Sequence, residues 1–521
     1  MRLRDRFDRS KRKPSSLPQR IGFALFWLLV LAYGFMIPLG ANWNAESHLY
    51  LTFAIVDHHS VNIDPYHQRL GDESFYGGHY YTDKAPGLSF LAVPLYAGLR
   101  AVNPHTKGQG YGVHSHMRYS IPRSTVYLRY IITYLLIVLP SAIFGVLLWL
   151  FLRRFTQSDG WALAIAVVYS LGTIAFVYST QFFSHQVTAI LLFGSFLVMF
   201  SRVRMQAPNM TVLGFAALAG LLAGYAVITE YPAAVIAALL AAYCYVVAPG
   251  RARALVAFIL GLVPAAALNV TYNLLAFGKP FSTGYSYVHS EAYQSQVHAG
   301  TLGLANPASY GIRAPSWNSL WQITFGPYRG IFLISPVLLL FFVGVVFLWR
   351  RRDLRAEFWL CSLVVILYFL MDASRGVEQN GWSGGWSIAS RHLTPMLPFM
   401  LLPIALALRI RAFRLAFVAL GSASIAMTFM AVAGGDQFSF SDHNPLVNEM
   451  LPNFFNGNLI ANWGAAFGLR GLASLVPLAV LAAALLSRLL WLLHVKGRRF
   501  TLHEPALLVG VPPRGYPEEA G

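Results

Sequence analysis

Ionisable side chains gather in one stretch, Trp43 to Gly87, although most of the 521-residue chain is apolar. The stretch contains the carboxylates of Glu46 and Asp83, the cation Lys84, and several histidines and tyrosines. A positioned carboxylate can take a proton from a hydroxyl group, and a lysine is a compact cation that suits a phosphate. The stretch therefore holds the residue types that acid–base chemistry beside a phosphate requires.

Glu46 has two interpretations. It follows the first apolar segment and lies near the start of a predicted helix. As a functional residue it would be a general base, or a carboxylate that binds an acceptor, placed where lipid meets water. As a structural residue it would supply negative charge to the helix N-terminus and complement the helix dipole. The spacing does not choose between them.

Lys84 is followed by Ala85 and Pro86. Proline favours an extended residue before it and suits the first turn of a helix, so Lys84 is expected at the head-group boundary. A phosphate or diphosphate is a fitting ligand for a cation placed there. The alternative is an interfacial lysine whose stem lies along apolar surface while its ammonium group reaches water.

A second cluster, from Gly381 to Leu393, lies directly before an apolar segment. Trp382 and Trp386 stand among three glycines, which suggests a close-packed loop beside a flat ligand such as a sugar ring. Arg391 lies at the outer end of the segment, against the usual charge bias, and a guanidinium there suits a carrier phosphate. An aromatic belt with an interfacial arginine is the alternative.

Composition places the chain among polytopic membrane proteins. It is 56% hydrophobic and only 12% charged, and its mean hydropathy is +0.53. The net charge of +18 comes from short basic clusters between apolar segments, which is how membrane topology is fixed, so no nucleic-acid partner is expected. Cys244 and Cys361 both lie in apolar segments, so neither a disulfide framework nor a thiolate metal site is predicted.

The predicted fold class is an all-α polytopic membrane protein of about twelve transmembrane helices, with a large first extracytoplasmic loop that carries interfacial helices. Apolar segments of about 17–25 residues are long enough to cross a bilayer. The predicted spans are Ile21–Gly40, Val126–Leu152, Trp161–Ser179, Gln186–Phe200, Thr211–Thr229, Pro232–Ala248, Leu255–Phe277, Ile331–Trp349, Phe358–Met371, Leu393–Leu408, Leu415–Ala433 and Gly471–Leu493.

The apolar stretch Ala85–Val102 decides the topology. It is short and contains two prolines. If it does not cross the membrane, all the Arg clusters can be cytoplasmic. We therefore expect it to lie in the outer interface, and a thirteenth span is the alternative. Residues 1–20 and 495–521 would be cytoplasmic tails around a membrane domain of residues 21–494, and the long loops 41–125 and 278–330 would both face outward.

The run Gly78-His79-Tyr80-Tyr81-Thr82-Asp83-Lys84-Ala85-Pro86, preceded by Glu46 after the first span, resembles the C-type membrane glycosyltransferases. These include protein O-mannosyltransferases, aminoarabinose transferases of lipid A and RgtA-like bacterial enzymes. The run from Trp382 to Leu393 is also similar to the RgtA-like group. The resemblance implies transfer of a sugar from a polyprenyl-phosphate carrier, with inversion and without a nucleotide site.

The resemblance also implies roles for individual residues. Glu46 would activate the acceptor hydroxyl, and Lys84 and Arg391 would bind the donor phosphate. The residues that would line the substrate are Tyr81, Asp83, His185, Trp382, Trp386 and His392.

The chain departs from the mannosyltransferase pattern at two places. Ala45-Glu46 stands where that pattern has an Asp-Glu pair, and His185 stands at its second acidic site. No cofactor is expected. A divalent metal held by His185 with Glu46 is an alternative, and a histidine that caps a helix by hydrogen bonding is the simpler interpretation.

Glu230 lies between two predicted spans, where a bare carboxylate is costly unless it is paired or hydrated. It would either face the cavity or pair with a cation such as Arg391.

We therefore expect an inverting glycosyltransferase in a bacterial inner membrane, with both termini cytoplasmic and a glycan, lipid or protein of the envelope as acceptor. The chain carries no P-loop, dinucleotide or zinc-protease motif. A secondary transporter or lipid flippase is the alternative from another class, although the chain lacks the paired broken spans typical of internal repeats. A non-catalytic scaffold for envelope synthesis is a third hypothesis.

Overall fold

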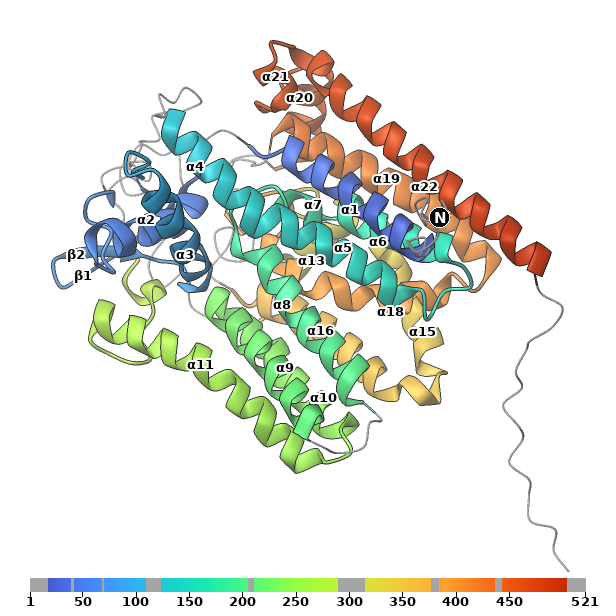
Figure 1. The fold of residues 1–521 in the computed structure, drawn as a ribbon, viewed down its shortest axis with the longest axis horizontal. Coiled ribbons are helices and arrows are strands. Elements are labelled where there is room, and N and C mark those ends of the chain that lie inside the picture. Colours follow the sequence, from blue (N-terminus) through green and yellow to red (C-terminus); the bar gives the residue numbers. More distant parts are fainter. Residues whose placement is uncertain are drawn as a thin grey trace, which may run out of the picture.

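A computed structural model describes residues 17–38, 42–67, 70–108, 123–204, 210–288, 314–375, 384–385, 387–435 and 443–503. These residues form mainly helices, and eight helices among them are long and apolar enough to cross a membrane (Figure 1). Their bounds are Leu17–Phe35, Val126–Leu152, Ser184–Val203, Met210–Thr229, Arg251–Phe277, Arg352–Ala373, Arg411–Gly434 and Gly471–Val495.

Each of these eight helices coincides with a predicted span, but the other four predicted spans are shorter helices. Their bounds are Asp159–Gly172, Tyr231–Val247, Pro336–Arg350 and Arg391–Ala407. The local backbone conformation explains why one of these four helices is shorter than the predicted span. Thr173 is extended and ends α6 (Asp159–Gly172), and its side chain caps α7 (Ile174–Tyr178). The number of twelve crossings therefore stays a prediction.

The other helices of the described part of the chain have these bounds. α1 is Leu17–Phe35, α4 is Arg123–Thr133, α5 is Leu139–Leu152, α8 is Ser184–Val198, α9 is Met210–Thr229, α10 is Ala234–Val247, α11 is Arg251–Phe277, α13 is Trp317–Thr324, α14 is Ile331–Ile334, α15 is Leu340–Trp349, α16 is Arg355–Ala373, α18 is Leu397–Ala407, α19 is Arg411–Gly434, α20 is Leu451–Phe455, α21 is Trp463–Ala466 and α22 is Val476–His503. The last helix thus runs past residue 494, where the predicted tail begins.

One element corrects the all-helical prediction. β1 (Glu73–Tyr76) and β2 (His79–Thr82) form an antiparallel hairpin. Its two turn residues, Gly77 and Gly78, both have positive φ, 59° and 88°. A two-residue turn of that kind matches the right-handed twist of the strands and favours glycine at both positions. The Gly-Gly pair between aromatic residues was therefore a readable hairpin signal.

Two helices flank the hairpin, as the prediction of interfacial helices requires. α2 (Trp43–His58) and α3 (Gly87–Val102) lie side by side at one end of the molecule (Figure 1). Asp57 of α2 joins them, because it accepts hydrogen bonds from the Tyr96 hydroxyl at 2.5 Å and from Arg100 Nε at 2.8 Å. α3 is thus a short helix held against α2, and its position at the membrane interface stays a prediction.

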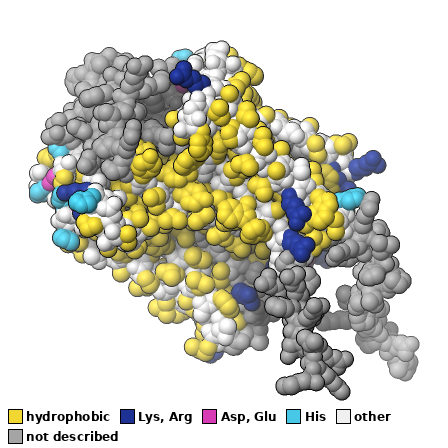
Figure 2. Space-filling model, turned by 45° about the horizontal axis from the view of Figure 1, so that its top comes forward, with side chains coloured by type: hydrophobic (Ala, Val, Ile, Leu, Met, Phe, Trp, Pro, Cys, Tyr) yellow, Lys and Arg dark blue, Asp and Glu magenta, His cyan; other side chains and the backbone are white. Residues whose placement is uncertain are grey.

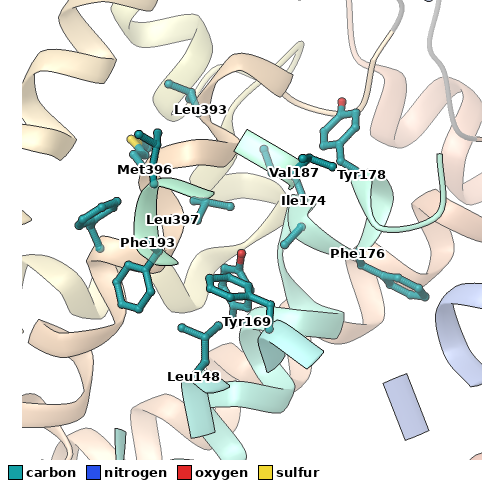
Figure 3. Packing of buried hydrophobic residues seen from close by; sticks show 14 of the residues in the cluster. Leu148, Tyr169, Ile174, Phe176, Tyr178, Val187, Phe193, Leu393, Met396 and Leu397 are labelled. Carbon is teal, nitrogen blue, oxygen red and sulfur yellow. The ribbon is translucent and has the colours of Figure 1, made fainter. Parts of the chain in front are cut away.

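Aromatic and aliphatic side chains from helices far apart in sequence fill the interior. Figure 3 shows Tyr169 of α6 and Phe193 of α8 close to Leu397 of α18, and all three are buried. The outside is apolar too. Figure 2 shows a face covered largely by hydrophobic side chains, as a protein surrounded by lipid requires.

Helices α9 and α11 lie side by side (Figure 1), and they approach each other through glycines. A Cβ atom at Gly220 of α9 would overlap the carbonyl oxygen of Phe258, and one at Gly261 of α11 would overlap that of Ala217. Small residues at helix contacts let two backbones pack closely within a membrane. The close approach of the two helices therefore depends on the lack of a side chain at these glycines.

We predict opposite effects for two Gly→Ala substitutions in α9. Gly220→Ala forces the helices apart and should cost about 1–3 kcal/mol of stability, as overpacking does. The Cβ atom that Gly214→Ala adds has no atom within 4 Å. This variant should therefore be neutral or should stabilise the protein by about 0.5–1 kcal/mol through helix propensity. Thermal unfolding of the detergent-purified variants measures both, and equal midpoints would contradict the proposed contact.

Candidate functional site

The N-terminus of α2 fixes Glu46. The side chain of Asn42 accepts hydrogen bonds from the backbone N–H groups of Asn44 and Ala45 at 2.8 and 3.4 Å. The backbone N–H of Asn42 donates in return to Glu46 Oε1 at 2.7 Å. This reciprocal arrangement is a variant of the capping box. Glu46 is fully buried and accepts a hydrogen bond at the start of the helix, and its role as a base stays a prediction.

Lys84 lies at the end of the hairpin and is bound to two carboxylates. Its Nζ donates to Asp72 Oδ2 and to Asp83 Oδ2, each at 2.8 Å. Ser47, the neighbour of Glu46 on α2, brings the hairpin against the helix, since its Oγ lies 2.6 Å from Thr82 Oγ1 and 3.4 Å from Asp83 Oδ1. The hairpin therefore places Lys84 beside the N-terminal half of α2.

The electrostatic environment keeps Lys84 charged. Burial alone would lower the pKa of Lys84, but the carboxylates of Asp72 and Asp83 raise it above its ordinary value. His48, the residue after Ser47, behaves in the opposite way. Burial lowers the pKa of His48 to about 3, and the charges of Lys84 and Arg391 act in the same direction. His48 is therefore neutral, and it lies within electrostatic reach of both predicted phosphate-binding cations.

Glu230 lies between two imidazoles from distant parts of the chain. Its Oε2 is 3.0 Å from Nδ1 of His185, at the start of α8, and its Oε1 is 3.4 Å from Nδ1 of His392. The two rings are 5.3 Å apart and nearly perpendicular. Burial would raise the pKa of Glu230, but the two histidines hold it well below its ordinary value. Glu230 is thus a buried carboxylate whose partners are histidines and not the predicted Arg391.

Arg391 links the two groups of residues. Its guanidinium carbon lies 5.5 Å from the centre of the Phe183 ring, two residues before His185. Its charge also opposes protonation of Lys84 and favours ionisation of Asp83. Lys84, Arg391 and the histidine–glutamate group, which comprises His185, Glu230 and His392, therefore form one cluster.

Two buried guanidinium N–H groups at this cluster have no hydrogen-bond partner in the described part of the chain. They are Nε of Arg391 and Nη1 of Arg375. Arg375 lies near the histidine–glutamate group, since its charge acts on His185 and His392. A buried N–H without an acceptor costs free energy, so an anionic ligand bound at either group would be stabilising.

A small pocket opens beside the N-terminus of α2. Its lining includes Ala45 and Phe183, the neighbour of Glu46 and the contact of Arg391, but not Glu46, Lys84 or Arg391 themselves. Its lining residues are Ile37, Pro38, Asn42, Ala45, Arg129, Thr133, Thr180, Gln181, Phe182 and Phe183.

The other predicted site residues have mixed outcomes. Asp83 and His392 lie in the cluster, as described above. Tyr81 packs its ring 5.3 Å from that of Phe277, which is a structural contact. Trp382 and Trp386 lie outside the described residues.

Sequence reasoning missed several members of the cluster, namely His48, Asp72, Asp372 and Arg375. Asp372 accepts a hydrogen bond from Ser390 Oγ at 2.5 Å. The Asp372–Arg375 pair had a readable signal, because two opposite charges three residues apart end an apolar run. His48 had none, since its environment comes from segments far away in the sequence.

Comparisons with known proteins give limited similarity. No family model matches this chain, and no curated protein matches it. Among solved structures, the chain is similar to the archaeal oligosaccharyltransferase AglB from Archaeoglobus fulgidus, which was solved in complex with an inhibitory peptide and a dolichol-phosphate. The two are 15% identical with a TM-score of 0.43, and the match covers 79% of this chain and 55% of that one. The functional proposal below is therefore based on the residues of the site and on the sequence motifs.

We predict that Lys84→Met destabilises the protein. Asp83 is 3% exposed, and removing its cation leaves an uncompensated buried charge, which typically costs about 3–5 kcal/mol. A second substitution, Asp83→Asn, removes that charge and should restore part of the loss. Thermal unfolding in detergent compares wild type, Lys84→Met and the double variant. A double variant no more stable than Lys84→Met would contradict the assignment.

Proposed function

We propose that this chain is an inverting glycosyltransferase that takes its sugar from a polyprenyl-phosphate carrier. The observation that supports this most is the convergence of Lys84 and Arg391 on one buried cluster beside the ends of apolar helices. A lipid-linked donor has an apolar tail that needs a membrane and a phosphate that needs cations. Both requirements are met at this one place.

The phosphate is proposed to bind between Arg391 and Lys84. The buried Nε of Arg391 has no acceptor among the described residues, and a phosphate oxygen would supply one in the bidentate geometry that guanidinium groups favour. Lys84 would add a point charge. Negative charge grows on the carrier phosphate as it departs, and fixed cations stabilise it without reorganisation.

The acceptor hydroxyl is proposed to approach through the pocket beside α2 and to give its proton to the carboxylate of Glu46. The acceptor oxygen then forms a bond to the anomeric carbon while the bond from that carbon to the phosphate oxygen breaks. The electron pair leaves on the polyprenyl phosphate, and attack from the opposite side inverts the anomeric carbon. The energy of transfer resides in the donor, which agrees with the lack of a nucleotide motif.

The reaction is proposed to take place on the extracytoplasmic face, with a glycan, lipid or protein of the envelope as acceptor. The distribution of basic clusters favours this orientation, because positively charged short loops stay in the cytoplasm. All the long polar segments then lie on the outer side.

Comparison of cells with and without this protein tests the proposed function. Mass spectrometry of the lipid fraction should find a polyprenyl-phosphate sugar that accumulates in cells without the protein, together with one envelope glycan that lacks the same sugar. Restoring the wild-type chain should reverse both changes. Identical lipid-linked sugars and identical glycans in the two strains would refute a transferase.

Two substitutions at Glu46 separate its proposed role as a base from its role at the helix start. Glu46→Gln keeps an oxygen that accepts from Asn42 N–H but loses the basic carboxylate, so folding should be preserved and transfer should fall by about 10²–10⁴-fold, the range of a lost general base. Glu46→Ala should lose transfer and also about 1 kcal/mol of stability with the capping contact. Retained transfer by Glu46→Gln, measured at equal membrane abundance, would exclude Glu46 as the base.

A further inference from the structure

We propose that His185, Glu230 and His392 form a binding site for one transition-metal dication of the Zn²⁺ type. The three side chains each offer one ligand atom, and these atoms lie within 4.8 Å of one another. The inference does not depend on the transferase activity, because the site is defined by its own ligand atoms.

The distances fit metal coordination. Zn²⁺ bonds to histidine nitrogen and carboxylate oxygen are about 2.0–2.2 Å long in tetrahedral sites, which puts two ligand atoms about 3.3 Å apart. The nitrogen–oxygen distances are 3.0 Å from His185 to one oxygen of Glu230 and 3.4 Å from His392 to the other. The nearly perpendicular rings bring their Nδ1 atoms to the carboxylate from different directions. The three ligand atoms lie within 4.8 Å of one another, so a bound cation would draw them closer together.

The protonation state also permits coordination. A metal bound at Nδ1 requires the histidine proton to sit on Nε2. Nε2 of His185 is buried and has no hydrogen-bond partner among the described residues, so no described donor holds this ring in the other tautomer. Moving the proton replaces the contact with Glu230 by a metal bond and leaves Nε2–H without an acceptor among the described residues, a cost that metal binding must exceed.

The acidic side chains of the cluster can compensate an added cation. The described cluster contains three basic and four acidic side chains in surroundings of low polarity. A dication would add positive charge, which attracts the phosphate of the proposed donor. The charged residues are Lys84, Arg375, Arg391, Asp72, Asp83, Glu230 and Asp372.

The ligand types select the class of metal. Two imidazoles and one carboxylate suit Zn²⁺, Co²⁺ and Fe²⁺, whereas Mg²⁺ prefers oxygen ligands and keeps several waters. Three protein ligands leave at least one coordination position open, as in catalytic zinc sites.

The test uses the full chain in detergent, freed of metal with a chelator and then dialysed against ZnCl₂. Elemental analysis should find one Zn²⁺ per wild-type chain, and Co²⁺ should give visible absorption bands typical of nitrogen and oxygen ligands. Zn²⁺ should raise the unfolding temperature, whereas Mg²⁺ should not. Zinc binding below about a tenth of one equivalent would overturn the proposal.

Three variants locate the bound metal. His185→Ala and His392→Ala should each lose the bound Zn²⁺, the Co²⁺ bands and the Zn²⁺-induced thermal shift. His105→Ala, at an exposed histidine outside the cluster, serves as the matched control and should keep all three. Unchanged stoichiometry in both cluster variants would place the metal elsewhere and overturn the assignment. If either alanine variant fails to fold, the metal content of the other one and of a His392→Gln variant tests the assignment.

The result is independent of the transferase proposal. Binding is measured without donor or acceptor, so a chain that binds no zinc could still transfer sugar. A chain that binds zinc but leaves the lipid-linked sugars of the cell unchanged would support the metal site alone.

Discussion

The structure depends on one electrostatic constraint, which is that charges buried among apolar helices must compensate one another. A carboxylate or ammonium group in such surroundings is costly unless it is paired. Glu230 is stabilised by hydrogen bonding with two imidazoles, and Lys84 is paired with the carboxylates of Asp72 and Asp83. Because the two histidines come from segments distant from Glu230, their contacts also fix how those segments pack. Electrostatics and architecture are therefore coupled at this cluster.

This coupling gives the β-hairpin its function in the fold. The hairpin is short and would be marginal on its own, but Ser47 and Thr82 hold it against α2. The Ser74 hydroxyl also donates a hydrogen bond to the carbonyl oxygen of Gly284, which joins the hairpin to the segment after α11. Lys84 directly follows the second strand, so the position of the hairpin sets the position of the cation. In the same way, the turn after α9 sets Glu230, and the first turns of α8 and of the segment Arg391–Met396 set the two histidines.

The sequence allowed part of this to be predicted. Eight of the predicted spans are long apolar helices in the structure, because hydropathy alone reports length and apolar content. The joint action of Lys84 and Arg391 on one phosphate stays a prediction, made from their residue types and their positions at segment ends. The hairpin was missed because the Gly77-Gly78 pair was not considered as a turn. The partners of Glu230 were also missed, because His185 and His392 lie 45 and 162 residues away in sequence, and no local pattern encodes such contacts.

The central claim is that Lys84 and Arg391 together bind the phosphate of a lipid carrier. The most direct measurement is an experimental structure of the full chain with a polyprenyl phosphate bound. We expect the phosphate oxygens within hydrogen-bonding distance of Lys84 Nζ and of the Arg391 guanidinium, with the lipid tail along the apolar helices. A phosphate bound away from both cations, in a structure where they keep their present positions, would contradict the account.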